Sequence, residues 1–215
     1  MKNKNLIILC IIGGLLFCNT TYAQRPQKRN TSPDVERLGR ALEYFTSGKY
    51  HECMLILSDL DEHYELNSRF RAFLGVCYYH EWEYEKACSY LDEVLPLLEA
   101  VAPQERSFYY FANGESHFNL QQYKEAIPQY QEQLKLCHND EKGDAYYRLG
   151  FCYMFLNEWT LALNNFELSL SSYKQYLNNE EHKARISQIE KMIKGCKKRV
   201  KNTTVDVNSK QPRIN

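Results

Sequence analysis

The stretch LGVCYYHEWEYEKACSYLDEV, residues 74–94, decides the fold of this chain. Its apolar positions follow a helical period twice, with Gly75 and Tyr78 on one face of a first segment and Ala87 and Leu91 on one face of a second. This spacing predicts two short amphipathic helices joined by a tight turn. Gly75 and Ala87 are small, so we expect the two helices to approach each other closely.

The same layout occurs four times along the chain. Each turn is a three-residue segment that ends in an aromatic residue, and the four turns begin at Gly48, Trp82, Gln121 and Asn157. A small residue stands seven positions before each turn, namely Ala41, Gly75, Gly114 and Gly150. The turns are 34, 39 and 36 residues apart, and the two longer steps have their extra residues in the connectors 99–105 and 137–144. Helix pairs of this kind cannot bury an apolar face alone, so we expect them to stack and share a core.

Three of these units, LGVCYYHEWEYEKACSYL, ANGESHFNLQQYKEAIPQYQEQL and LGFCYMFLNEWTLALNNF, closely resemble the tetratricopeptide repeat. The first unit, RALEYFTSGKYHECMLIL, departs most, with Arg40 where that family usually has Leu and Cys53 where it usually has Ala. The resemblance covers residues 34–171. It implies an all-α fold, a right-handed superhelical array of about four helix–turn–helix repeats, to which we add a C-terminal capping helix.

The residues outside the repeats predict the remaining organisation. Residues 1–23 have the three parts of a secretory signal peptide: basic residues at the start, an apolar segment over 6–17, and Thr21-Tyr22-Ala23 before the cut. We therefore expect an exported, periplasmic protein that begins at Gln24. The alternative is an outer-membrane lipoprotein, since residues 15–18 resemble a lipobox that would make Cys18 a lipidated first residue, although Phe17 does not fit that motif. Residues 24–33 are expected to be a flexible linker.

Charge is unevenly distributed although the net charge is zero. Residues 34–182 carry 12 basic against 25 acidic side chains, whereas residues 183–215 carry 10 against 2. An acidic body argues against a nucleic-acid-binding core. Within 172–201 the apolar residues recur at helical spacing opposite a lysine-rich face, which predicts a capping helix; a partner-binding or membrane-surface helix is the alternative. Residues 202–215 are predicted to be a disordered tail, and any membrane contact would be made by this basic end or by a lipidated Cys18.

No stretch has the residue pattern of a known catalytic, nucleotide-binding or metal-binding motif, so we expect no enzyme, no cofactor and no metal. His51 and Cys53 are two residues apart and point in different directions on one helix. His117 stands where the other units have Tyr, and we expect it to pack between helices. The mature chain keeps six cysteines, for which buried free thiols are our first interpretation and disulfides the alternative.

The resemblance also implies a binding surface, because in this family the first helix of each unit lines a concave groove that binds peptides or partner helices. Transferred by register, the predicted groove consists of Leu42, Phe45, Phe73, Val76, Tyr79, His80, Phe111, Glu115, Phe118, Tyr147, Arg148, Phe151 and Phe155. An apolar surface of this size usually marks a binding site. We therefore predict a protein-interaction scaffold that binds a partner segment. In the alternative, the chain is a structural subunit of an envelope complex and its own residues fill the groove.

Overall fold

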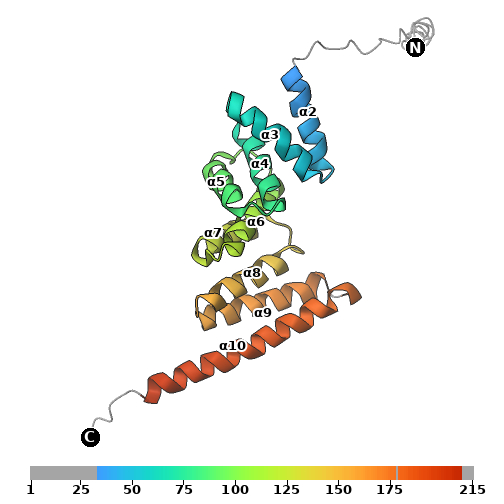
Figure 1. Ribbon diagram of the computed structural model, residues 1–215. Helices are drawn as coiled ribbons and strands as arrows, with labels where there is room; N and C mark the ends of the chain where they lie inside the picture. Colours follow the sequence, from blue (N-terminus) through green and yellow to red (C-terminus); the bar gives the residue numbers. More distant parts are fainter. Residues whose placement is uncertain (1–32, 178, 210–215) are drawn as a thin grey trace, which may run out of the picture. The chain divides into compact units, whose positions relative to one another are not determined.

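The computed structural model describes residues 33–177 and 179–209, and within them the chain forms α-helices and two short 3₁₀ helices, with no strand. Figure 1 shows their order. The elements are α2 (Pro33–Thr46), α3 (Tyr50–Tyr64), α4 (Ser68–His80), α5 (Tyr84–Val94), η1 (Leu95–Leu97), α6 (Pro103–Asn119), α7 (Tyr123–Leu136), α8 (Lys142–Phe155), α9 (Trp159–Tyr176), η2 (Glu180–His182) and α10 (Lys183–Ser209). The all-α fold predicted from the sequence is confirmed.

The helix starts follow from local sequence. The side-chain oxygen of Asn67 accepts hydrogen bonds from the backbone N–H groups of Arg69 and Phe70, at 3.1 and 3.2 Å, and so caps α4. Pro103 occupies the first position of α6, where its missing N–H leaves no helical hydrogen bond unmade.

The four predicted turns join the two helices of each pair and share one backbone conformation. Their first residues, Gly48, Trp82, Gln121 and Asn157, all have positive φ, between 60° and 70°. In the second pair the Glu83 N–H donates to the carbonyl of Tyr78 at 2.9 Å and the Trp82 N–H donates to that of Tyr79 at 3.1 Å. This arrangement ends a helix while satisfying its last carbonyls. The register deduced from the sequence therefore places each turn correctly.

In three of the four pairs, a glycine before the turn receives a large side chain from the second helix of its pair. A Cβ added at Gly75 would lie 2.7 Å from Leu91, and one added at Gly150 would lie 2.7 Å from Phe166. A Cβ added at Gly114 would lie 2.8 Å from Tyr130. In these three pairs the two helices therefore interlock where a large side chain packs on a glycine.

Neighbouring pairs pack in chain order, α3 on α4, α5 on α6, α7 on α8, and α9 on α10 (Figure 1). Their buried side chains form three successive clusters, centred on α3–α6, on α6–α8 and on α8–α10. The last cluster includes Ile189, Ile193 and Cys196, through which α10 covers the exposed side of α9. These contacts are those of a helical solenoid with a capping helix.

Two helices continue past the predicted boundaries. Helix α9 continues to Tyr176, beyond residue 171, and α10 continues to Ser209, so that it includes residues 202–209. No proline interrupts either helix, since Pro212 is the first proline after Pro128. The predicted signal peptide and residues 24–32 of the linker lie outside the described residues, whereas Pro33 begins α2. None of the described helices is apolar over a length sufficient to cross a bilayer.

Candidate functional site

The N-terminal half of the predicted groove is filled by its own aromatic side chains. Phe73 and Val76 are buried core residues, and the ring of Phe45 packs on that of Phe73 with centroids 4.4 Å apart. His80 stacks on Tyr50 at 3.7 Å, and burial lowers the pKa of its imidazole. Phe73 and Val76 are therefore buried between α2, α3, α4 and α6, whereas Phe45 and His80 are half-buried and covered in part by other rings. Leu42 is exposed at the far end of this cluster.

Glu115 and Tyr79 are also less accessible than predicted. Glu115 is only 4% exposed; it pairs with Arg148 at 2.5 Å and accepts a hydrogen bond from the Tyr130 hydroxyl at 2.6 Å. Burial and the Glu115 charge raise the pKa of Tyr130. Burial is the largest single influence on the pKa of Arg148 and lowers it, but the charge and hydrogen bond of Glu115, together with Tyr130 and Tyr79, raise the pKa overall. The half-buried Tyr79 has a pKa of about 12, chiefly through burial. Glu115 is therefore a buried anchor that holds Arg148 in place.

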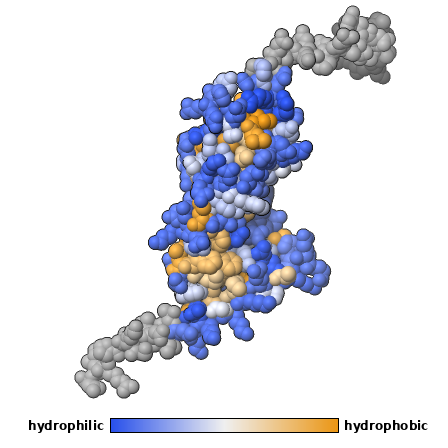
Figure 2. All heavy atoms as spheres, in the orientation of Figure 1, coloured by the Kyte–Doolittle hydropathy of each residue, from blue (hydrophilic) through white to orange (hydrophobic). Residues whose placement is uncertain are grey.

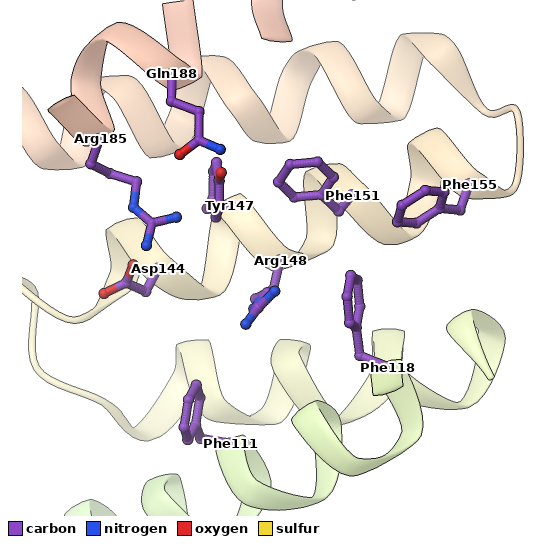
Figure 3. Close-up of a pocket in the computed structure, with 9 residues that line it drawn as sticks. All are labelled: Phe111, Phe118, Asp144, Tyr147, Arg148, Phe151, Phe155, Arg185 and Gln188. Atoms are coloured by element: carbon purple, nitrogen blue, oxygen red, sulfur yellow. The ribbon is translucent and has the colours of Figure 1, made fainter. Parts of the chain in front are cut away.

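The C-terminal half of the predicted groove is an open pocket of about 500 Å³. Figure 3 shows its lining, which comes from α6, α8 and α10 and consists of Phe111, Phe118, Asp144, Tyr147, Arg148, Phe151, Phe155, Arg185 and Gln188. Figure 2 shows an apolar area on the same part of the array, around α8. We call this site the aromatic pocket.

Helical periodicity explains why these side chains meet. On α8 the lining residues from Asp144 to Phe155 stand at positions i, i+3, i+4, i+7 and i+11, which places them on one face. The rings support one another: Phe155 stacks on Tyr123 at 4.7 Å, and Phe151 meets Tyr147 edge-on at 4.8 Å. Phe155 remains 47% exposed although it touches other rings. The pocket is thus preformed, with accessible aromatic surface.

Two cationic side chains lie over aromatic rings of the pocket. The guanidinium of Arg148 lies 4.9 Å from the centroid of Phe118, and that of Arg185 lies 4.4 Å from the centroid of Tyr147. Both contacts are within the range of cation–π attraction. The lining therefore combines apolar rings with fixed hydrogen-bond donors, a composition suited to holding a side chain and the polar backbone beside it.

Six of the thirteen predicted groove residues line the aromatic pocket, namely Phe111, Phe118, Tyr147, Arg148, Phe151 and Phe155. The other three lining residues, Asp144, Arg185 and Gln188, were not predicted from the sequence. The helical period of α8 points to Asp144, which is one turn before Arg148. No comparable signal exists for Arg185 and Gln188, because they lie on α10 and their position depends on how that helix packs.

The described cysteines are free; five are buried and Cys137 is half-buried. Among the described residues, no three His, Cys, Asp or Glu side chains are grouped so as to hold a metal ion. His117 is buried, with its Nε2 3.2 Å from Asp92 and its Nδ1 2.7 Å from Gln122. It packs between helices, as its alignment with tyrosines predicted.

Comparison with known proteins agrees with this architecture. The stacked helix pairs place this chain in the class of α-helical repeat solenoids. Within that class the tetratricopeptide repeat family model matches residues 144–178, the fourth helix pair, in agreement with the resemblance seen in the sequence. No curated protein matches the chain.

Several solved structures share the fold. A MamA structure designated AMB-1 is 20% identical and has a TM-score of 0.55, covering 68% of this chain and 82% of its own. MamA 41-end from Desulfovibrio magneticus RS-1 is 15% identical, with a TM-score of 0.56 and coverage of 85% and 99%. The apo form of RapI is 12% identical, with a TM-score of 0.59 and coverage of 81% and 66%. At these identities the similarity is one of fold.

Proposed function

We propose that this protein is an exported, non-enzymatic interaction adaptor that binds a segment of another protein in the aromatic pocket. The observation that carries the proposal is the pocket itself, a preformed cavity of about 500 Å³ whose rings stay accessible after the array has packed. The tetratricopeptide repeat resemblance, which the family model supports at residues 144–178, implies such a surface for a protein partner, and MamA and RapI share the fold. The leader predicted at residues 1–23 supports export to the periplasm.

The physical basis of binding is the burial of apolar surface on rings that are already ordered. A partner aromatic or aliphatic side chain in the pocket would gain about 1.5–3 kcal/mol from burial. Because Phe151, Phe155 and Phe118 already contact one another, little side-chain entropy is lost on binding. Arg148 is fixed by Glu115 and offers its remaining N–H donors to the partner backbone.

Phe155 provides the direct test, because it is half exposed and its truncation leaves the core intact. We expect Phe155→Ala to reduce capture of the partner about tenfold, as removal of an aromatic anchor usually costs more than 1 kcal/mol. The measurement is chemical cross-linking in the native cell followed by quantification of the captured protein. Leu168→Ala on α9 is the matched control, because Leu168 has the same 47% exposure and does not line the pocket.

Three outcomes decide the proposal. Loss of one specific product with Phe155→Ala, and its retention with Leu168→Ala, supports pocket binding. Equal capture by both variants and the unchanged protein refutes it. Export is tested separately by the first residue of the mature chain, which we expect to be Gln24; a lipidated Cys18 would indicate the lipoprotein route.

A second candidate function rests on α10. Arg185 and Gln188 of this helix form one wall of the aromatic pocket, so the chain's own terminal helix partly closes the groove. This favours, as the alternative, a structural subunit of an envelope complex that makes its contacts elsewhere. In that case photo-cross-linkers placed at Phe155 would yield no product, whereas the same probe at Leu168 on the outer surface would.

A further inference from the structure

A second pocket of about 420 Å³ adjoins the aromatic pocket, and Phe111 and Asp144 line both. Its other lining residues are Gln104, Ser107, Phe108, Gln133, Asp140, Glu141 and Leu177. We call it the acidic pocket. The two pockets form adjacent subsites, since one ring and one carboxylate belong to each of them.

The acidic pocket is formed in part by the connector between α7 and α8, which supplies Asp140 and Glu141. Gln104 and Asp144 lie in the first turns of α6 and α8, directly after the two connectors that exceed the 34-residue repeat. The residues in and beside these connectors therefore do more than join helices, because they place three carboxylates and an amide around one cavity.

The carboxylates of the connector are not neutralised by a basic side chain of the pocket. Asp140 and Glu141 are exposed, and Glu141 accepts a hydrogen bond only from the backbone N–H of His138, at 2.9 Å. Asp144 accepts one from the Tyr173 hydroxyl at 2.5 Å, and Figure 3 shows Arg185, which lines the aromatic pocket, next to Asp144. Lys142 follows in the sequence but does not line the cavity. The acidic pocket thus presents net negative charge.

Gln133 supplies an independent observation. Its side chain lines the pocket and is only 6% exposed, yet within the described part of the chain nothing donates a hydrogen bond to its Oε1. A buried carbonyl oxygen without a donor costs about 1–3 kcal/mol. A ligand that brings an N–H group into the pocket would remove this cost.

We infer that the acidic pocket binds the guanidinium group of an arginine in the partner segment whose apolar side chain occupies the aromatic pocket, an inference that rests on the proposed function. A guanidinium carries five N–H donors in one plane, which suits several acceptors distributed around a cavity better than a compact ammonium does. The rings of Phe108 and Phe111 give its flat face an apolar wall on which to stack. Asp140 and Glu141 supply the opposite charge, and Gln133 Oε1 supplies a neutral acceptor.

Synthetic peptides test this inference without knowledge of the natural partner. The probes are fluorescent, end-blocked peptides in a glycine–serine background, each with one phenylalanine and one arginine at varied spacing. Matched sets replace the arginine with lysine or glutamine, or the phenylalanine with serine. Fluorescence anisotropy with the full mature protein gives the affinities. At the best spacing we expect the arginine peptide to bind about tenfold more tightly than the glutamine peptide.

Variants assign that preference to the pocket. The double variant Asp140→Asn, Glu141→Gln should bind the arginine and glutamine peptides equally while still requiring phenylalanine. Its matched control, Glu85→Gln with Glu125→Gln, removes two exposed acidic charges from α5 and α7 outside both pockets and should retain the preference. Gln133→Leu preserves most of the side-chain volume and should reduce the preference several-fold. Circular dichroism of each variant verifies the fold.

The peptide-binding results distinguish failure of this inference from failure of the proposed function. If the unchanged protein binds arginine and glutamine peptides equally but needs phenylalanine, this inference is overturned and the proposed function stands. Equal affinity for lysine and arginine peptides overturns the guanidinium assignment. If the preference survives the Asp140 and Glu141 substitutions, it arises elsewhere on the acidic surface and the inference is wrong. If no phenylalanine peptide binds, the proposed function fails and this inference fails with it.

Discussion

Substituting Gly150 with alanine adds one methyl group that has two opposing effects on the stability of the fold. Alanine is favoured over glycine inside a helix by about 1 kcal/mol, so a variant free of contacts would be stabilised. At Gly150, however, the new Cβ would lie 2.7 Å from two atoms of the Phe166 ring. Phe166 is fully buried and also packs against Tyr147 and Phe151, at centroid distances of 6.0 and 5.3 Å, so its ring cannot swing aside.

Overpacking of this kind costs about 1–3 kcal/mol, which exceeds the gain in helix propensity. We therefore expect Gly150→Ala to lower the free energy of unfolding by about 1 kcal/mol net. Gly195→Ala on α10 is the matched control, because a Cβ there meets nothing within 4 Å and should stabilise by up to about 1 kcal/mol. Urea titration followed by circular dichroism measures both variants, and the double variant Gly150→Ala, Phe166→Leu should recover part of the loss.

The result that would refute this reasoning is a stabilised Gly150→Ala protein with a midpoint equal to or above that of Gly195→Ala. Such a result would mean that the α8–α9 crossing has free space. The close packing of Gly150 against Phe166 would then not be the contact that fixes this pair.

Three further predictions concern single residues. Trp82→Gly should stabilise the protein by about 1 kcal/mol in urea titration, because Trp82 has φ 62°, is 79% exposed, and a side chain in the left-handed region costs about 1–2 kcal/mol. Burial opposes the charge of His117, yet the hydrogen bonds that the imidazolium makes with Asp92, Cys88 and Gln122 raise its pKa to about 10, above its ordinary value of 6.5. The protonated imidazole therefore stabilises the fold fully below pH 6.5, and this stabilisation is lost as the pH rises towards 10. Between these pH values the free energy of unfolding of the unchanged protein should fall by up to about 1.4 kcal/mol per pH unit more than that of His117→Tyr. Urea midpoints of the two proteins that change in parallel with pH would contradict this prediction. In thiol titration of the native protein, Cys137 should react before the other described cysteines, because it is half-buried and they are buried. Its reaction should still be slow, because burial raises its pKa. A faster reaction at any other cysteine would contradict the observed packing.

The sequence predicts this fold well because the repeat constrains it at several positions. Residues at the turns, such as Gln121 and Asn157, occupy the same left-handed conformation despite their different side chains. A repeat aligned on its turns predicts which residues cross, and the Gly114–Tyr130 contact follows that register. Local spacing is sufficient for such contacts because both partners belong to one helix pair.

The candidate site is less predictable because it depends on packing between pairs. Val76 and Phe151 both stand six positions before the turn of their repeat, yet Val76 is buried in the core, whereas Phe151 borders an open pocket. Periodicity alone cannot distinguish these cases, since both residues lie on the apolar face of a first helix. Arg185 was missed for a related reason, because its place beside Tyr147 depends on how the terminal helix crosses the array.

The contact between Arg185 and Tyr147 links the occupancy of the aromatic pocket to the local stability of α10. Arg185 and Gln188 lie in the first two turns of that helix, so any opening of its N-terminal end removes one wall of the pocket. A ligand that requires this wall binds only the closed form and thereby stabilises it by mass action. The capping helix is consequently the part of the solenoid in which a bound partner would slow amide hydrogen exchange most.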